Sequence, residues 1–149
     1  MKQTLYLDTS VPNAYFDDRN PERQRFTREF WGKLNSLDLF ISSLVLAEIA
    51  DLKAGAKKGP LLELLEGIEV LPVTAECEQL ADEYMAAGIF PKKSRDDALH
   101  IATAVIHSLD YLVSWNYEHI VKVKTRRMVG LVDAKKGYKP IEIIAPPEL

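Results

Sequence analysis

The sequence predicts one α/β domain, residues 1–149, whose mostly parallel sheet is covered by helices on both faces. A length of 149 residues suits a single domain, and apolar types make up 47% of the chain, enough for a sizeable core. Short apolar stretches alternate with segments of helical periodicity. This alternation is typical of parallel strands joined by helical crossovers. No internal repeat, low-complexity segment or long linker divides the sequence.

The first expected strand, residues 4–8, is a short apolar run that ends in the carboxylate Asp8. Thr9 and Ser10 follow as helix-cap residues. Pro12 then falls in a first helical turn, where its missing N–H removes no hydrogen bond. The chain therefore begins with a strand, a polar junction and a helix.

The later elements follow from the same signals. Aromatic residues and leucines recur at helical spacing over residues 23–37, and Ser42 or Ser43 is placed to cap the helix after the second strand. Further strands are expected at residues 39–41, 68–73, 111–114 and 141–144, and further helices at residues 60–66, 75–87, 94–108 and within 122–139. Strands and helices thus alternate over most of the chain.

Charge and cysteine content exclude several classes of protein. With 19 basic and 22 acidic residues the formal charge is −3, which excludes a generally basic nucleic-acid binder but not a local basic surface. The single cysteine, Cys77, makes neither an internal disulfide nor a zinc cluster. No signal-peptide pattern and no apolar run of membrane-spanning length occurs. We expect a soluble cytoplasmic protein with no membrane partner.

Polar residues follow two of the predicted strands, at the edge where open α/β sheets bind ligands. Asp8 follows the first strand, and Ser114 and Asn116 follow the fourth. Asp8 is equally compatible with a helix-cap or turn aspartate. Asn116 is interpreted by default as a turn residue, with a metal ligand or a water-orienting amide as alternatives.

Glu48 falls in helical phase with Leu44, Val45 and Leu52, so its side chain should point at least partly inward. Charged groups are rarely buried unless they are paired or hold a metal. The alternative is a glutamate at the edge of the helix, whose stem lies on the core while its carboxylate reaches water.

Asp96 and Asp97 open a helix that is otherwise small and apolar. Ser94 and Asp97 have the spacing of a capping box, and acids in a first turn are favoured by the helix dipole. A helix so rich in alanine and isoleucine is nevertheless typical of a central, close-packed position. Its first turn should therefore lie in the interior crevice.

Three carboxylates and an amide gathered at one edge of a sheet would repel one another without a cation. Mg²⁺ or Mn²⁺ takes such oxygen ligands and keeps several waters. A carboxylate-rich site suits phosphate-ester hydrolysis, in which the metal activates a water and stabilises the leaving oxygen, with ions roughly 3.5–4 Å apart in two-metal sites. The residues alone thus favour a metal-dependent hydrolase.

The same residues lie in four segments that resemble the motifs of PIN-domain ribonucleases, in particular the VapC-type toxins of bacterial and archaeal toxin–antitoxin pairs. The resemblance runs from Met1 to about His119, in the family's order and spacing. The segments are Leu7-Asp8-Thr9-Ser10, Ser42-Ser43-Leu44-Val45-Leu46-Ala47-Glu48, Asp97-Ala98-Leu99-His100-Ile101-Ala102-Thr103-Ala104 and Leu112-Val113-Ser114-Trp115-Asn116.

The resemblance implies a three-layer α/β/α sandwich and hydrolysis of single-stranded or loop RNA that leaves a 3′-hydroxyl and a 5′-phosphate. It implies that Asp8, Glu48 and Asp97 bind Mg²⁺ or Mn²⁺. Asn116 stands where many members have a fourth acid, which weakens the case for a second metal. Ser114 would hydrogen-bond a ligand or a bound water. The family also implies a small antitoxin partner, which wraps hydrophobic grooves on the toxin, and a homodimer.

An acidic pocket repels RNA, so a nuclease needs a neighbouring basic surface. Residues 122–139 contain seven basic residues and one acidic residue, a local charge of +6. Apolar residues within the segment indicate a packed helix, and an ordinary solvated helix face is the alternative to RNA binding. The candidate RNA-contacting residues are Ser114, Lys122, Lys124, Arg126 and Arg127.

Other functions fit the residues less well. A haloacid-dehalogenase-like phosphatase needs a second aspartate two residues after Asp8, where Ser10 stands, and no glycine-rich nucleotide-binding loop occurs. His100, His107 and His119 lack the spacing of a zinc site and are expected to pack or to support other side chains. The remaining alternative is a catalytically silent PIN-like domain that acts through protein or RNA contacts.

Overall fold

The computed structural model describes residues 2–53 and 55–149. Its sheet has five strands in the order β3-β2-β1-β4-β5, and all four neighbouring pairs are parallel. The predicted parallel sheet is therefore confirmed, with each strand close to its expected position. The strands are β1 (Gln3–Leu7), β2 (Leu37–Ser42), β3 (Glu69–Leu71), β4 (Tyr111–Val113) and β5 (Glu142–Ile144).

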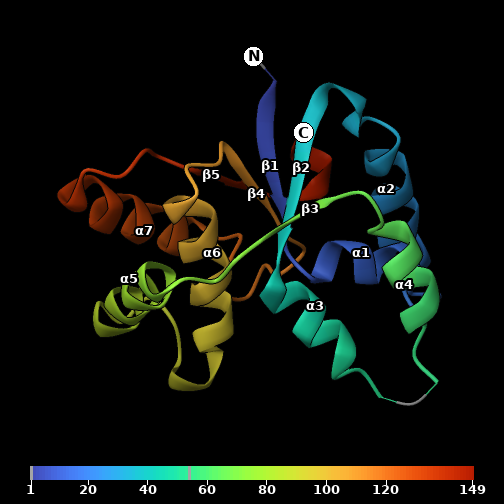
Figure 1. Cartoon of the computed structure of the whole chain (residues 1–149), viewed down its shortest axis with the longest axis horizontal. Helices are drawn as coiled ribbons and strands as arrows, with labels where there is room; N and C mark the ends of the chain where they lie inside the picture. Colours follow the sequence, from blue (N-terminus) through green and yellow to red (C-terminus); the bar gives the residue numbers. More distant parts are fainter. Residues whose placement is uncertain (1, 54) are drawn as a thin grey trace.

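Helices cover both faces of the sheet, as the α/β/α expectation requires. In Figure 1, α5, α6 and α7 lie together on one side, and α1, α2 and α4 lie on the other. The helices are α1 (Ser10–Tyr15), α2 (Pro21–Trp31), α3 (Ser43–Ala50), α4 (Lys58–Leu64), α5 (Ala75–Ala86), α6 (Arg95–Ile106) and α7 (Val123–Lys136), with 3₁₀ turns η1 (Leu34–Ser36), η2 (Lys92–Ser94) and η3 (Pro146–Glu148). No helix among the described residues is long and apolar enough to cross a membrane.

The helix expected over residues 23–37 is shorter than predicted and begins earlier. Asn20 caps α2 by accepting a hydrogen bond from the backbone N–H of Arg23, and the helix ends at Trp31 with Gly32 as its C-cap. Glycine is a poor helix former, and the chain must turn here to enter β2. The buried Leu34, which suggested a continuing helix, packs from the separate turn η1.

The central strands bring the candidate site together at their carboxyl ends. Leu5, Tyr6 and Leu7 of β1 are fully buried. The backbone N–H of Asp8 donates to the carbonyl of Val113 at 3.0 Å, so β1 and β4 end side by side. Every residue from Ala98 to Val105 of α6 is buried, which confirms the central position inferred for this helix.

Candidate active site

Asp8 is 5% exposed and is held by hydroxyl groups on one of its two oxygens. Its Oδ2 accepts hydrogen bonds from Ser10 Oγ at 2.6 Å and from Ser114 Oγ at 2.9 Å. Its Oδ1 lies 3.4 Å from His100 Nε2. The N-cap position of α1 belongs to Thr9. Asp8 therefore lies just outside the helix, with one oxygen bound by serines and the other facing His100.

Glu48 points inward from α3, as its helical phase predicted. Ser42 caps this helix by accepting a hydrogen bond from the Leu44 N–H. Glu48 Oε1 accepts a hydrogen bond from Thr9 Oγ1 at 2.6 Å and lies 2.6 Å from His100 Nε2. Burial acts to raise the pKa of Glu48, but the hydrogen bond and charge of His100 and the Thr9 hydroxyl bring it below its usual value.

Asp97 stands in the first turn of α6, close to Asp8 and Asn116. Burial, followed by the charge of Asp8, raises the pKa of Asp97 to about 6, and a hydrogen bond from the Asn116 side chain opposes that rise. Ser94 takes the N-cap position without a side-chain capping bond, so the expected capping box is not formed. Asp97 therefore faces the other acids.

Asn116 is both a turn residue and a neighbour of Asp97. Its Oδ1 accepts a hydrogen bond from the backbone N–H of His119 at 2.9 Å, which closes the turn after β4. The preceding Trp115 donates its indole N–H to Thr27 Oγ1 at 2.8 Å and thereby anchors this turn to α2. The amide oxygen of Asn116 thus already has one protein partner, which makes it a weaker metal ligand than a carboxylate.

His100 contacts the acids directly, whereas the sequence predicted that it would pack or support other side chains. It is 1% exposed, and its Nε2 faces both Glu48 and Asp8. Burial opposes protonation of the ring, yet the charges of Asp8, Glu48 and Asp97 raise its pKa. The available sequence signal was its position three residues after Asp97, on the same side of a helix.

The donor chemistry of the site fits a hard divalent cation. Asp8, Glu48 and Asp97 supply carboxylate oxygens, and these three acids carry more negative charge than the one buried histidine between them can balance. Within residues 2–53 and 55–149, however, no three His, Cys, Asp or Glu side chains are arranged to hold a metal ion as they stand. The residues therefore suit the ion in type, and their ligation stays a prediction.

Some residues of the predicted basic surface are exposed, and others form ion pairs with acidic residues of the same chain. Lys124 and Arg127 are exposed on α7, and Lys122 is partly exposed at its start. Arg126 lies 3.7 Å from Glu148 and reaches the carbonyl of Ile143, so it ties α7 to the C-terminal segment. The distal lysines also pair with acids, Lys136 with Glu83 and Lys139 with Asp110.

Ser114 differs from the other candidate RNA contacts because it is fully buried. Its hydroxyl donates to Asp8 and accepts the backbone N–H of Asn116 at 2.9 Å. A side chain in this position cannot reach RNA in this structure. We correct its assignment accordingly: Ser114 orients Asp8.

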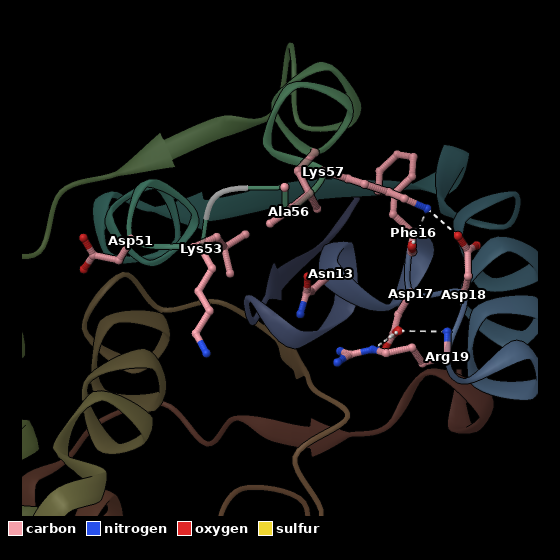
Figure 2. A pocket seen from close by; sticks show the side chains of 12 residues that line it. Asn13, Phe16, Asp17, Asp18, Arg19, Asp51, Lys53, Ala56 and Lys57 are labelled. Atoms are coloured by element: carbon pink, nitrogen blue, oxygen red, sulfur yellow. Dashed lines mark hydrogen bonds and ion pairs between the residues drawn. The ribbon is translucent and has the colours of Figure 1, made fainter.

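A cavity of about 680 Å³ lies beside α1, the end of α3 and the start of α4. Its lining includes Asn13, Asp51 and Leu52 but none of Asp8, Glu48 and Asp97, so it is separate from the acid cluster. Figure 2 shows Asn13 and Lys53 extending toward the same open side, while dashed lines mark the ion pairs Lys57–Asp18 and Arg19–Asp17 at its rim.

Comparison with solved structures shows the same fold. A chain of the VapBC2 complex of Rickettsia felis, solved with a DNA fragment from their promoter, aligns with a TM-score of 0.57 and 16% identity over 96% of this chain and 98% of that one. VapC20 of Mycobacterium tuberculosis, described as a sarcin–ricin loop cleaving toxin, aligns with a TM-score of 0.61 and 17% identity over 77% and 92%. No curated protein matches the sequence.

The family comparison covers most of the chain. The PIN domain model matches residues 5–125, a range that contains Asp8, Glu48, Asp97 and Asn116. The match agrees with the parallel sheet, with the acids at its carboxyl edge, and with the motifs that suggested the resemblance. The chain belongs to the PIN domain family.

Proposed function

We propose that this protein is a metal-dependent endoribonuclease that hydrolyses RNA phosphodiester bonds and acts as a VapC-type toxin of a toxin–antitoxin pair in the cytoplasm. One observation carries the proposal: Asp8, Glu48 and Asp97, from three separate elements, converge at the carboxyl edge of the sheet. Membership of the PIN family and the fold shared with a toxin described as cleaving the sarcin–ricin loop support it.

Mg²⁺ or Mn²⁺ would be held by Asp8, Glu48 and Asp97, with Asn116 as a weaker oxygen donor. When bound, such an ion activates water and stabilises the charge that develops on the leaving oxygen. The chain itself orients these ligands: Ser10 and Ser114 hold one oxygen of Asp8, as described above. In-line attack by water leaves a 3′-hydroxyl and a 5′-phosphate, as the family implies.

We propose that Lys122, Lys124 and Arg127 hold the RNA backbone. They lie at the start of α7, next to the turn that carries Asn116, because the Thr125 hydroxyl donates to the His119 carbonyl at 2.8 Å. Phosphates bound here would offset the repulsion between RNA and the acids. We propose no such role for Arg126, since its guanidinium already pairs with the Glu148 carboxylate.

The proposed partners follow the family. We propose a small antitoxin protein and a homodimer, with RNA as the substrate. The chain that matches over 98% of its length in the VapBC2 structure comes from such a two-component complex, which supports an antitoxin partner here.

The proposal is tested by RNA cleavage with the purified full chain in Mn²⁺, in Mg²⁺ and with chelator, beside Asp97→Asn. We expect cleavage that requires metal and disappears in Asp97→Asn while the thermal melting temperature stays at or above that of the unmodified chain. Asp96→Asn is the matched control, because Asp96 is the exposed neighbour of Asp97 in the same helical turn. It should retain activity.

Two results would contradict the proposal. Full activity in Asp97→Asn would remove Asp97 from the site. Intact RNA across single-stranded and loop substrates, with a folded wild-type chain and metal present, would favour the catalytically silent domain that acts through protein or RNA contacts.

A further inference from the structure

We infer that Tyr6 and His100 are positioning residues that orient the carboxylates of Glu48 and Asp8 for ligand binding. The inference rests on the proposed function, because it takes these acids as the metal-binding groups. It concerns residues that neither touch RNA nor ligate the ion. Their role is to decide which oxygen of each carboxylate remains available.

A chain of buried hydrogen bonds connects β2 to the acids. Ser42 Oγ accepts the Leu44 N–H at 3.2 Å and lies 2.7 Å from the Tyr6 hydroxyl. The Tyr6 hydroxyl lies 2.7 Å from His100 Nδ1, and His100 Nε2 lies 2.6 Å from Glu48 Oε1. The chain joins residues from β1, β2, α3 and α6, so it exists only in the folded protein.

The chemistry of each group decides which atom donates in each of these hydrogen bonds. A tyrosine hydroxyl carries its hydrogen at neutral pH, so Tyr6, 2.7 Å from Nδ1, can donate to that nitrogen of a neutral imidazole. The imidazole hydrogen then resides on Nε2. In the imidazolium form both nitrogens carry hydrogens. In either form, an N–H group of His100 faces Glu48 and Asp8.

In both acids two short hydrogen bonds hold one oxygen, and the other oxygen has weaker contacts or none. Glu48 Oε1 accepts hydrogen bonds from the Thr9 hydroxyl and from His100 Nε2. Glu48 Oε2 has no hydrogen-bond partner among residues 2–53 and 55–149. Asp8 Oδ2 accepts hydrogen bonds from the Ser10 and Ser114 hydroxyls, while the one polar contact of Oδ1 within the described part of the chain is His100 Nε2 at 3.4 Å. This arrangement presents Glu48 Oε2 and Asp8 Oδ1 to a ligand.

Packing alone does not account for this pair. Tyr6 and His100 meet edge to face, with ring centroids 5.8 Å apart, in a core where an apolar side chain would avoid the cost of burying a polar ring. A buried polar network is tolerated when every member is hydrogen-bonded, and each member here has a partner. The network ends at the two acids that need orientation.

The test measures Mn²⁺ binding to the full chain by titration calorimetry without RNA, beside the melting temperature of each variant. Groups that hydrogen-bond metal ligands typically contribute 10–100-fold to metal affinity. We expect Mn²⁺ affinity to fall about 10-fold in Tyr6→Phe and up to about 100-fold in His100→Leu. His100→Gln should recover part of the loss, since its amide N–H can donate to Glu48.

Matched controls carry the same changes away from the site. Tyr111→Phe removes a hydroxyl that bonds Gln3 at the opposite end of the sheet, and His107→Leu removes the ring that bonds the Pro72 carbonyl at the end of α6. Both should bind Mn²⁺ as the unmodified chain does. This outcome would separate positioning from a general effect of losing a polar ring.

The outcomes distinguish the inference from the function on which it rests. Folded Tyr6→Phe with unchanged Mn²⁺ affinity overturns the inference and leaves the proposed ribonuclease intact. This variant decides the question even if His100→Leu does not fold, because it removes a single oxygen. An unmodified chain that binds no Mn²⁺ overturns both.

Discussion

Two buried aspartates of this protein have opposite surroundings. Asp8, at the end of β1, is 5% exposed and receives two serine hydroxyls, with His100 beside its other oxygen. Asp133, within α7, is 2% exposed, and among residues 2–53 and 55–149 the hydroxyl of Tyr84, at 2.5 Å, is the one donor to its side chain. Its Oδ2 is buried without a hydrogen-bond partner in the part of the chain that the structure describes.

The difference shows that a buried carboxylate needs several hydrogen-bond donors around it to stay ionised. Burying an ionised carboxylate is costly unless donors surround it. Burial raises the pKa of Asp133 to about 6, against which the single bond from Tyr84 is insufficient. Donors from three separate segments instead gather at Asp8. Asp8 is therefore surrounded by donors that stabilise negative charge, whereas Asp133, at the contact between α5 and α7, is not.

The largest expected difference is in activity, measured with the same substitution at both aspartates. Asp8→Asn should lower the initial rate of RNA cleavage at least about 100-fold, because a neutral amide replaces a proposed metal-binding carboxylate. Asp133→Asn should retain the activity of the unmodified chain, since Asp133 lies outside the site. Equal losses in both variants would show that the effect follows stability and not chemistry.

A second prediction removes the single donor of Asp133. Tyr84→Phe leaves both oxygens of a buried carboxyl without a partner and should lower the free energy of unfolding by about 1–3 kcal/mol. Urea unfolding of the full chain measures this loss. The loss should be greater at pH 7.5 than at pH 4.5, because the ionised form of Asp133 suffers most. A loss of equal size at both pH values would contradict the assignment of Tyr84 as its donor.

The pKa of Asp133 predicts how stability depends on pH. Because the folded value of about 6 exceeds the unfolded value of 3.8, the folded state binds the proton more tightly, and this contribution to stability is lost as pH rises through about 6. Between pH 4.5 and 7.5 the group should lower the free energy of unfolding by about 2 kcal/mol. Asp133→Asn should reduce the measured difference between the two pH values by that amount; an unchanged difference would exclude Asp133 as its source.

The smallest effect on stability is expected for exposed charges. Replacing Lys124 and Arg127 with alanine should change the free energy of unfolding by less than about 0.5 kcal/mol. If both contact phosphates, RNA binding should weaken, and the slope of log affinity against log salt should fall by about 2. Lys33→Ala, an exposed lysine near the start of β2, is the control for charge alone. An unchanged slope of log affinity against log salt would show that Lys124 and Arg127 of α7 do not contact RNA phosphates.

Local pattern was enough to predict most of the elements and to select the candidate acids. Apolar runs and helical spacing depend on neighbouring residues, so the strands near residues 4–8 and 111–114 could be located, and Glu48 could be assigned an inward face. Asp97 could be preferred to Asp96 by its place in a recognisable segment. The helix boundary at Gly32 was missed because the apolar spacing continues through a separate turn.

Contacts between distant segments were decided only by the tertiary structure. Ser114 meets Asp8 across 106 residues, His100 meets Glu48 across 52, and Arg126 meets Glu148 beyond the rest of α7 and the whole of β5. Spacing along a helix or strand tells which face a side chain occupies, but not which donor the fold brings against it. The sequence alone therefore determined which residues are acidic and where the strands end. Their hydrogen-bond partners, and hence which carboxylate oxygens remain available, depend on the packing of strands and helices that are far apart in the chain.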